Sequence, residues 1–139
     1  MFEKNKNTVL AVLILGIAAA LIVSLAFTGN QGEGNNKYTL EESKSIAKSF
    51  VERSPTYSFD GYDLELNETL YPDIAGCEDC YTFVFDFKSR HGGYGNRSGK
   101  IVTQVITPHT AHVTVEHGEI TTAVLDQKWN IMEQKPIQG

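Results

Sequence analysis

This chain of 139 residues is poor in basic residues and in cysteine, and both shortages limit what it can do. It has 12 Lys and Arg residues against 17 Asp and Glu residues, a formal net charge of −5 at pH 7. Proteins that bind nucleic acid or anionic membrane surfaces rely on an excess of positive charge, so the sequence argues against both partners. The only cysteines are Cys77 and Cys80. Neither follows the apolar N-terminal segment directly, which excludes a lipid-modified N-terminus.

Catalytic motifs are missing as well. The chain contains no nucleophile elbow and no zinc-protease helix. Its glycine-rich segment joins two predicted strands and opens no helix, so it does not match a nucleotide-binding fingerprint. We therefore predict a protein that is not an enzyme and that needs no cofactor, with a hydrolase as a further alternative.

What the chain does have is one long apolar segment, residues 9–27, with no charged residue inside it. A helix needs about 20 apolar residues to cross a bilayer, so this segment is long enough to span the membrane once. Lys4 and Lys6 precede it and the next basic residue is Lys37. We therefore expect residues 1–8 in the cytoplasm and the rest of the chain outside. A cleaved signal peptide is the alternative, although its apolar region usually has only about 7–15 residues.

The remainder of the chain divides into a linker and one domain. Residues 28–37 are rich in Gly and Asn, which predicts a flexible tether. Residues 38–139 are enough for one small domain and not for two. The organisation is thus an anchor, a linker and a single exported domain.

The exported domain begins with the pattern of an amphipathic helix. Thr39 and Glu42 have the spacing of a capping box. Four apolar residues recur at helical spacing and form one stripe: Ile46, Ala47, Phe50 and Val51. Pro55 restricts the residue before it and should end the helix near Arg53. The apolar stripe predicts that this helix covers one face of a sheet.

After Pro55 apolar and polar residues alternate with a period of two, which predicts strands. The predicted strands are residues 57–66 with a break at Gly61, 81–88, 101–107, 112–116 and 120–125, followed by a short segment at Trp129 and Ile131. His117 and Gly118 predict a tight turn. One helix followed by an antiparallel meander of four to five strands is an α+β fold. In its core we expect Ile46 to pack against Phe83 and Phe85.

This order of elements, with the aromatic strand 81–88, resembles small PepSY-like and cystatin-like domains exported by prokaryotic cells. The resemblance covers Thr39 to about Trp129. Residues 87–95 and 104–109 are also similar to parts of membrane-anchored prokaryotic proteins. PepSY-like domains bind or restrain other exported proteins, so the resemblance implies a binding or regulatory role and assigns no individual residue to it.

The motif Cys77-Glu78-Asp79-Cys80 is compatible with a redox-active disulfide, a structural disulfide or a pair of metal ligands. A disulfide of the thioredoxin type has its first cysteine at the start of a helix, whereas here a strand follows, which argues against redox catalysis. Outside the cytoplasm two neighbouring thiols tend to oxidise. This favours a disulfide between Cys77 and Cys80.

Zinc binding is the alternative for these cysteines. In a simple meander, the start of strand 81–88, the end of strand 101–107 and the start of strand 112–116 lie at one end of the sheet. That end then carries four ligands: Cys77, Cys80, His109 and His112. Two thiolates and two imidazoles are a complete zinc ligand set. The alternative function is therefore an extracytoplasmic zinc-binding domain.

The opposite end of the predicted sheet carries a long glycine-rich loop, residues 89–99, and we expect His117 at the same end. Long loops on a rigid sheet often carry binding residues, and glycines allow backbone N–H groups to converge on an anion. The candidate binding residues are Arg90, His91, Tyr94 and Arg97. A solvated hairpin without a ligand is the alternative. Asn96-Arg97-Ser98 is also a glycosylation sequon, and a glycan there would mask the loop.

Together these patterns predict a single-pass protein of the cell membrane whose C-terminal α+β domain lies outside the cytoplasm. We expect this domain to be a binding or regulatory module. Its expected partner is another exported protein or a peptide, and no nucleic acid.

Overall fold

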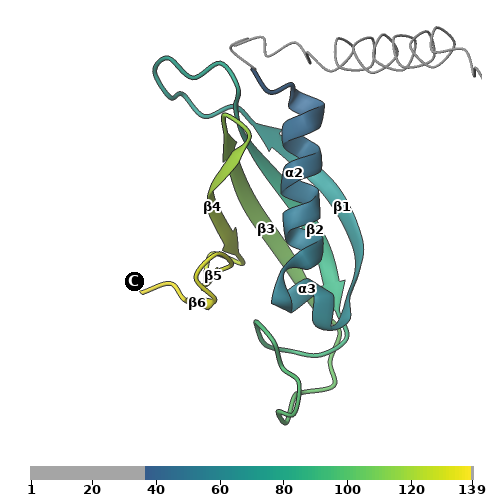
Figure 1. Ribbon diagram of the computed structural model, residues 1–139. Coiled ribbons are helices and arrows are strands. Elements are labelled where there is room, and N and C mark those ends of the chain that lie inside the picture. Colours follow the sequence, from purple (N-terminus) through teal and green to yellow (C-terminus); the bar gives the residue numbers. More distant parts are fainter. Residues whose placement is uncertain (1–36, 139) are drawn as a thin grey trace, which may run out of the picture. The chain divides into compact units, whose positions relative to one another are not determined.

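The computed structural model describes residues 37–138. The predicted cytoplasmic segment, the anchor at residues 9–27 and residues 28–36 of the linker lie outside the described residues. Among the described residues, no helix combines the length and apolarity that a membrane span requires. Two helices precede six strands in the described chain (Figure 1). They are α2 (Leu40–Arg53), α3 (Pro55–Asp60), β1 (Gly61–Leu70), β2 (Cys80–Ser89), β3 (Thr107–Glu116), β4 (Glu119–Leu125), β5 (Trp129–Asn130) and β6 (Lys135–Pro136).

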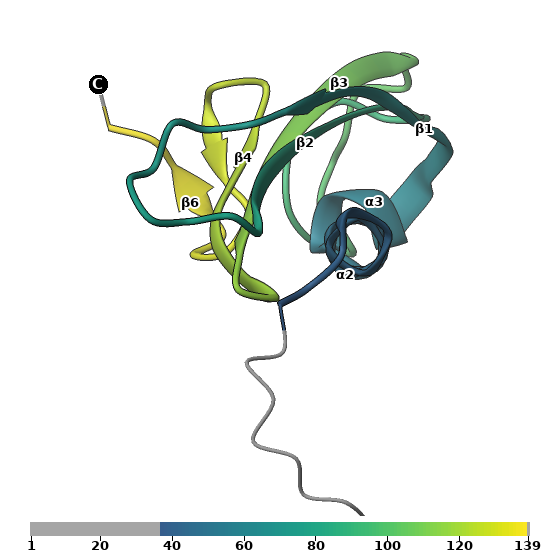
Figure 2. The ribbon, with the colours of Figure 1, turned by 90° about the horizontal axis from the view of Figure 1, so that it is seen from above.

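The six strands form one antiparallel sheet in the order β1-β2-β3-β4-β5-β6. Because each strand pairs with the next along the chain, the sheet is a meander. α2 lies against one face of it (Figure 1), and Figure 2, which looks down this helix, shows the sheet arching over it. The predicted α+β class with a helix on an antiparallel meander is confirmed, with six strands instead of four or five.

α2 begins and ends where the sequence pattern predicts. The Thr39 hydroxyl accepts a hydrogen bond from the Glu42 N–H at 3.2 Å, and the Glu42 carboxylate accepts one from the Thr39 N–H at 2.8 Å. This capping box satisfies N–H groups that the first turn of a helix leaves free. The helix ends at Arg53, two residues before Pro55, as expected.

The core lies between α2 and the sheet, but the helix face differs from the prediction. The side chains of α2 that are buried belong to Ser43, Ala47 and Val51, whereas Ile46 is only half-buried and lies outside the core cluster. Small residues on the helix let its backbone approach the large aromatic side chains of β2. The buried residues of the sheet are Phe83, Phe85, Phe87, Ala111, Val113, Val115, Ala123 and Leu125, followed by Ile131 after β5.

Residues 57–60 form part of α3 and not the predicted strand. Pro55 occupies the first turn of this helix, where its missing N–H costs nothing, and Tyr57 packs edge-on against Phe87 with ring centroids 5.2 Å apart. At the exit of α3, a Cβ on Gly61 would lie 2.5 Å from the Tyr57 ring, so the chain requires glycine there. The alternation of Tyr57 and Phe59 with polar residues predicts a strand, but packing of Tyr57 against β2 favours a helix here.

Residues 101–106, predicted as most of a strand, belong to the loop that connects β2 and β3. These two strands have ten residues each and pair over their whole length, from Cys80 opposite Glu116 to Ser89 opposite Thr107. Pro108 lies inside β3, but β4 pairs with β3 only from Ala111 onward. The N–H that Pro108 lacks would therefore face an unpaired stretch of the strand edge, where proline is tolerated.

Candidate functional site

The pairing of β2 with β3 decides which candidate residues share an end of the sheet. We call the end with Cys80 and the β3–β4 turn the Cys end, and the end with Ser89 and the loop of residues 90–106 the loop end. Residues 101–106 are not a strand, so the chain crosses the sheet once less before residue 117 than predicted. His109 and His117 therefore lie at the opposite ends of the sheet from those we expected. His117 lies at the Cys end, which corrects the expectation that it accompanies the loop, and His109 lies at the loop end opposite Phe87.

The predicted zinc set is therefore not brought together. His109 is seven pairs along the β2–β3 ladder from the Cys80–Glu116 pair at the Cys end. His112 lies in the middle of β3, between Val84 and Val124 of the neighbouring strands. Its Nδ1 atom is buried without a hydrogen-bond partner among the described residues. Neither histidine is a ligand partner for Cys77 or Cys80 in this fold.

A buried ion pair holds the loop of residues 90–106 against α3. The Arg97 side chain is 3% exposed, and its Nη2 atom lies 2.5 Å from Asp60 Oδ1. Its Nη1 atom donates a hydrogen bond to the Gly93 carbonyl at 2.8 Å, and its guanidinium group lies over the Phe59 ring at 4.7 Å. The Asp60 carboxylate neutralises this charge inside the protein. Arg97 therefore holds the loop in place, and its predicted role as a binding residue of the loop stays a prediction.

The other candidate residues of the loop are placed similarly, except for Arg90. His91 Nδ1 lies 2.7 Å from Asp60 Oδ2. Tyr94 stacks on Trp129, with ring centroids 5.5 Å apart and planes 9° from parallel. Arg90 is exposed and lies over the Tyr62 ring at 5.0 Å. His91, Tyr94 and Arg97 thus hold the loop through contacts with the rest of the domain, and of the four candidate residues only Arg90 is exposed.

A second polar network ties β2, β3 and the turn after β4 together at the loop end. Ser89 Oγ lies 3.0 Å from His109 Nε2, and His109 Nδ1 lies 2.7 Å from Asp126 Oδ2. These are the residue types of a hydrolase triad. The Ser89 side chain is fully buried, however, and its hydroxyl donates a hydrogen bond to the His91 carbonyl at 2.7 Å. The network therefore joins structural elements and offers no exposed nucleophile.

Asp126 is the charged centre of this network. Burial opposes its ionisation, but hydrogen bonds from His109 and from the Thr110 N–H outweigh that effect and hold the pKa of Asp126 below its usual value. Tyr94 also donates a hydrogen bond to Asp126 at 3.1 Å. Burial and this carboxylate raise the pKa of Tyr94 to about 12. The Tyr94 hydroxyl thus remains a donor at neutral pH.

The lowered pKa of Asp126 predicts a specific dependence of the domain's stability on pH. The stabilisation from ionised Asp126 is complete above its unfolded pKa of about 3.9 and is lost as the pH falls through the lower pKa of the folded state. The difference in free energy of unfolding between the wild type and Asp126→Asn should therefore shrink as the pH falls below about 4. Urea unfolding of both proteins, as residues 37–139, between neutral and acid pH measures this difference. A difference that does not change with pH would contradict a stabilising role of ionised Asp126.

A groove lies between α3 and the loop of residues 90–106. It has a volume of about 490 Å³. Its lining residues are Pro55, Ser58, Phe59, Asn96 and Ser98. Arg97 is buried, while Asn96 and Ser98 on either side of it are exposed. The sequon Asn96-Arg97-Ser98 is the only feature of the sequence that draws attention to these two groove residues.

The outer part of the same loop carries exposed aliphatic side chains. Ile101 is fully exposed, and Val105 and Ile106 are 50% and 64% exposed. Of the described backbone, only the Gly92 and Val105 N–H groups bond to residues 101–106, both at the Thr103 carbonyl. The segment therefore leaves apolar side chains and backbone polar groups open to solvent.

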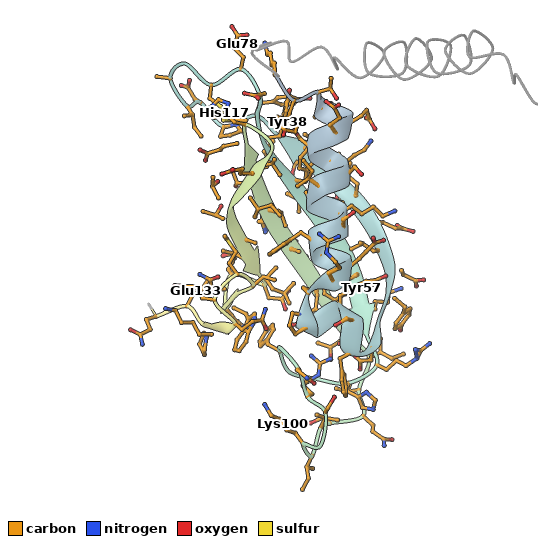
Figure 3. The ribbon with its side chains drawn as sticks, in the orientation of Figure 1. Tyr38, Tyr57, Glu78, Lys100, His117 and Glu133 are labelled. Atoms are coloured by element: carbon orange, nitrogen blue, oxygen red, sulfur yellow. A yellow bond between two sulfur atoms is a disulfide. The ribbon has the colours of Figure 1, made fainter. Side chains whose placement is uncertain are left out.

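The Cys end gathers a second cluster of reactive side chains. A disulfide joins Cys77 and Cys80. His117, in the β3–β4 turn, places its Nε2 atom 3.7 Å from the Cys77 sulfur and its Nδ1 atom 2.7 Å from Asp79 Oδ1. Figure 3 shows His117, Glu78 and Tyr38 at this end and Lys100 at the other. Cys77, Cys80 and His117 are the group of side chains in the described part of the chain that could hold a metal ion.

Three parts of the chain position this cluster. The Tyr38 N–H donates a hydrogen bond to Asp79 Oδ2 at 3.2 Å, and the Tyr38 ring covers Gly118, where a Cβ would lie 2.3 Å from a ring carbon. Burial opposes ionisation of Asp79, but the bond from Tyr38 and the neighbouring His117 hold the pKa of Asp79 below its usual value. Had the sequence analysis paired residues 80–89 with residues 107–116, it would have placed His117 beside the cysteines.

Comparison with known proteins gives no family for this chain. No protein-family model matches it, and no curated protein and no solved structure shows a significant match.

Proposed function

We propose that this protein is a membrane-anchored extracytoplasmic binding module that holds a peptide segment of another exported protein. The observation that carries the proposal is the groove between α3 and the loop of residues 90–106. Its walls are fixed by the buried Arg97–Asp60 ion pair. A groove that exists before its ligand arrives spares the ordering cost that a mobile loop adds to binding.

The size and lining of the groove fit a short peptide. Its volume of about 490 Å³ lies within the range of about 300–1,000 Å³ that is usual for ligand sites. Pro55 and Phe59 supply apolar surface, while Ser58, Asn96 and Ser98 supply hydrogen-bonding groups. None of these five residues is charged, and the nearby Arg97 is neutralised by Asp60. This chemistry favours a neutral or mixed peptide over a polyanion.

The position of the groove is consistent with a tether at the other end of the domain. Lys37, the first described residue, forms an ion pair with Glu78 at the Cys end. The groove lies at the opposite end of the described domain from Lys37, so the chain that precedes Lys37 joins the domain away from the groove. The PepSY-like resemblance agrees with this role and remains a prediction.

Site-specific photocrosslinking of the full chain in its own cell envelope tests this function. A photoreactive amino acid at Ser58 or Asn96, on the two walls of the groove, should capture the same partner. The same amino acid at Thr122, an exposed position on β4, is the matched control and should capture none of it. A Ser98→Trp substitution should fill the groove and reduce capture at Ser58 by about tenfold, which corresponds to about 1.4 kcal/mol of lost binding.

Three results would overturn the proposal. The first is the absence of any adduct from both groove positions. The second is an identical pattern of adducts from the groove and from Thr122. The third is an adduct at Ser58 that persists unchanged in Ser98→Trp, which would place the binding surface elsewhere on the domain.

A further inference from the structure

The cluster at the Cys end contains three side chains that can bind a metal ion, and Asp79 orients one of them, His117. The ligand atoms of Cys77, Cys80 and His117 all lie within 4.8 Å of one another. Cys80 is buried, Cys77 is half-buried and His117 is exposed, so an ion could reach the cluster from the side of His117. The groove lies at the opposite end of the sheet, so this site is independent of the proposed binding function.

The spacing of these atoms matches zinc coordination. Tetrahedral zinc has Zn–S bonds of about 2.3 Å and Zn–N bonds of about 2.0–2.1 Å, which places a coordinated sulfur about 3.6 Å from a coordinated nitrogen. His117 Nε2 lies 3.7 Å from the Cys77 sulfur. The C-x-x-C spacing of the two thiols is the usual one in zinc sites. The two sulfurs, now bonded to each other, need only separate to about 3.8 Å, the tetrahedral distance.

The His117 ring is already oriented for metal binding. Its Nδ1 atom lies 2.7 Å from Asp79 Oδ1, and the Asp79 side chain is only 6% exposed. An Nδ1–H that donates to a carboxylate leaves the Nε2 lone pair free, and that lone pair points to the cysteines. A carboxylate behind a histidine is the usual support of a zinc ligand. The Tyr38 N–H holds Asp79 in turn.

We propose that Cys77, Cys80 and His117 form a zinc site that exists only when the Cys77–Cys80 disulfide is reduced. A dithiol reductant supplies two electrons and two protons to the disulfide and is itself oxidised to a disulfide. Zinc then binds both sulfurs and His117 Nε2, and two thiol protons are released to solvent. A water molecule completes the tetrahedron. Oxidation removes both sulfur ligands, so the occupancy of the site depends on the redox state around the protein.

Cobalt and zinc titrations of the full chain, purified in detergent and reduced with a phosphine, test this proposal. Reduced wild-type protein should bind one equivalent of Co²⁺ with a thiolate-to-cobalt charge-transfer band, which one equivalent of Zn²⁺ should abolish. Oxidised protein should show no such band. Asp79→Asn should weaken the affinity by about 10–100-fold, the usual effect of losing a supporting carboxylate.

His117→Asn is the decisive variant because it keeps the turn. His117 has a φ of 51°, and asparagine is favoured at this turn position before glycine. The variant should bind Co²⁺ at least about tenfold more weakly, and added imidazole should restore part of the band. His112→Asn, which changes a histidine outside the cluster, is the matched control and should bind as the wild type does. The absence of a charge-transfer band in reduced wild type, or equal affinities of His117→Asn and wild type, would overturn the proposal.

Discussion

Replacing Arg97 by Met should lower the free energy of unfolding by about 3–5 kcal/mol, the usual cost of removing one partner of a buried ion pair. Arg97 and Asp60 are 3% and 8% exposed, so the substitution leaves a buried carboxylate whose remaining side-chain partner is His91. It also removes the hydrogen bond to the Gly93 carbonyl. The loss should therefore both destabilise the domain and release the loop that forms the groove. Urea unfolding of residues 37–139 measures the first effect.

The matched control is an ion pair at the surface. Lys88 and Asp63 are 3.5 Å apart and each more than half exposed, so Lys88→Met should cost about 0–1 kcal/mol. The double variant Asp60→Asn/Arg97→Met should be less destabilised than the sum of its single variants, because no unpaired charge remains. Equal costs for Arg97→Met and Lys88→Met would show that the Arg97–Asp60 pair is not buried in solution.

Phe85→Ala should destabilise the domain by a similar amount, about 3–5 kcal/mol, because it opens a cavity that the surrounding structure only partly fills. The Phe85 side chain is 1% exposed, at the centre of β2, and its ring centroid lies 6.3 Å from that of Phe83. Domains of this size are stable by only about 5–15 kcal/mol, so much of the protein should unfold well below the wild-type midpoint. Thermal and urea unfolding measure the loss.

Thr82→Ala provides the comparison on the same strand. Thr82 points to the opposite face of β2, where its hydroxyl lies 2.8 Å from that of Thr114. Losing this half-buried hydrogen bond should cost about 0.5–1.5 kcal/mol. If the two substitutions cost the same, Phe85 does not face α2, and the assignment of the two faces of the sheet is wrong.

Elements whose determinants are local could be predicted from the sequence. The capping box of Thr39 and Glu42 and the stop before Pro55 delimit α2 correctly. The alternation in β2 and the turn at His117 and Gly118 are also correct. Each depends on residues a few positions apart, whose backbone preferences act without the rest of the fold.

Only the tertiary structure decided the rest. Residues 57–60 become helical because Tyr57 packs against Phe87, about 30 residues further along the chain. The β-branched residues 101–106 remain a loop because β2 and β3 already pair over their full length. Isolated β-propensity does not reveal this, since a strand is stable only beside a partner.

The candidate sites depend on the same long-range pairing. Arg97 meets Asp60 across 37 positions, and His117 meets Cys77 across 40. In a meander each strand runs opposite to the one before it. The prediction placed two strands, 101–107 and 112–116, where the structure has β3 alone, and this extra reversal places every later turn at the wrong end of the predicted sheet. The residue types of both sites are visible in the sequence, but which of them meet depends on the number and register of the strands between them, and those are set by packing against α2.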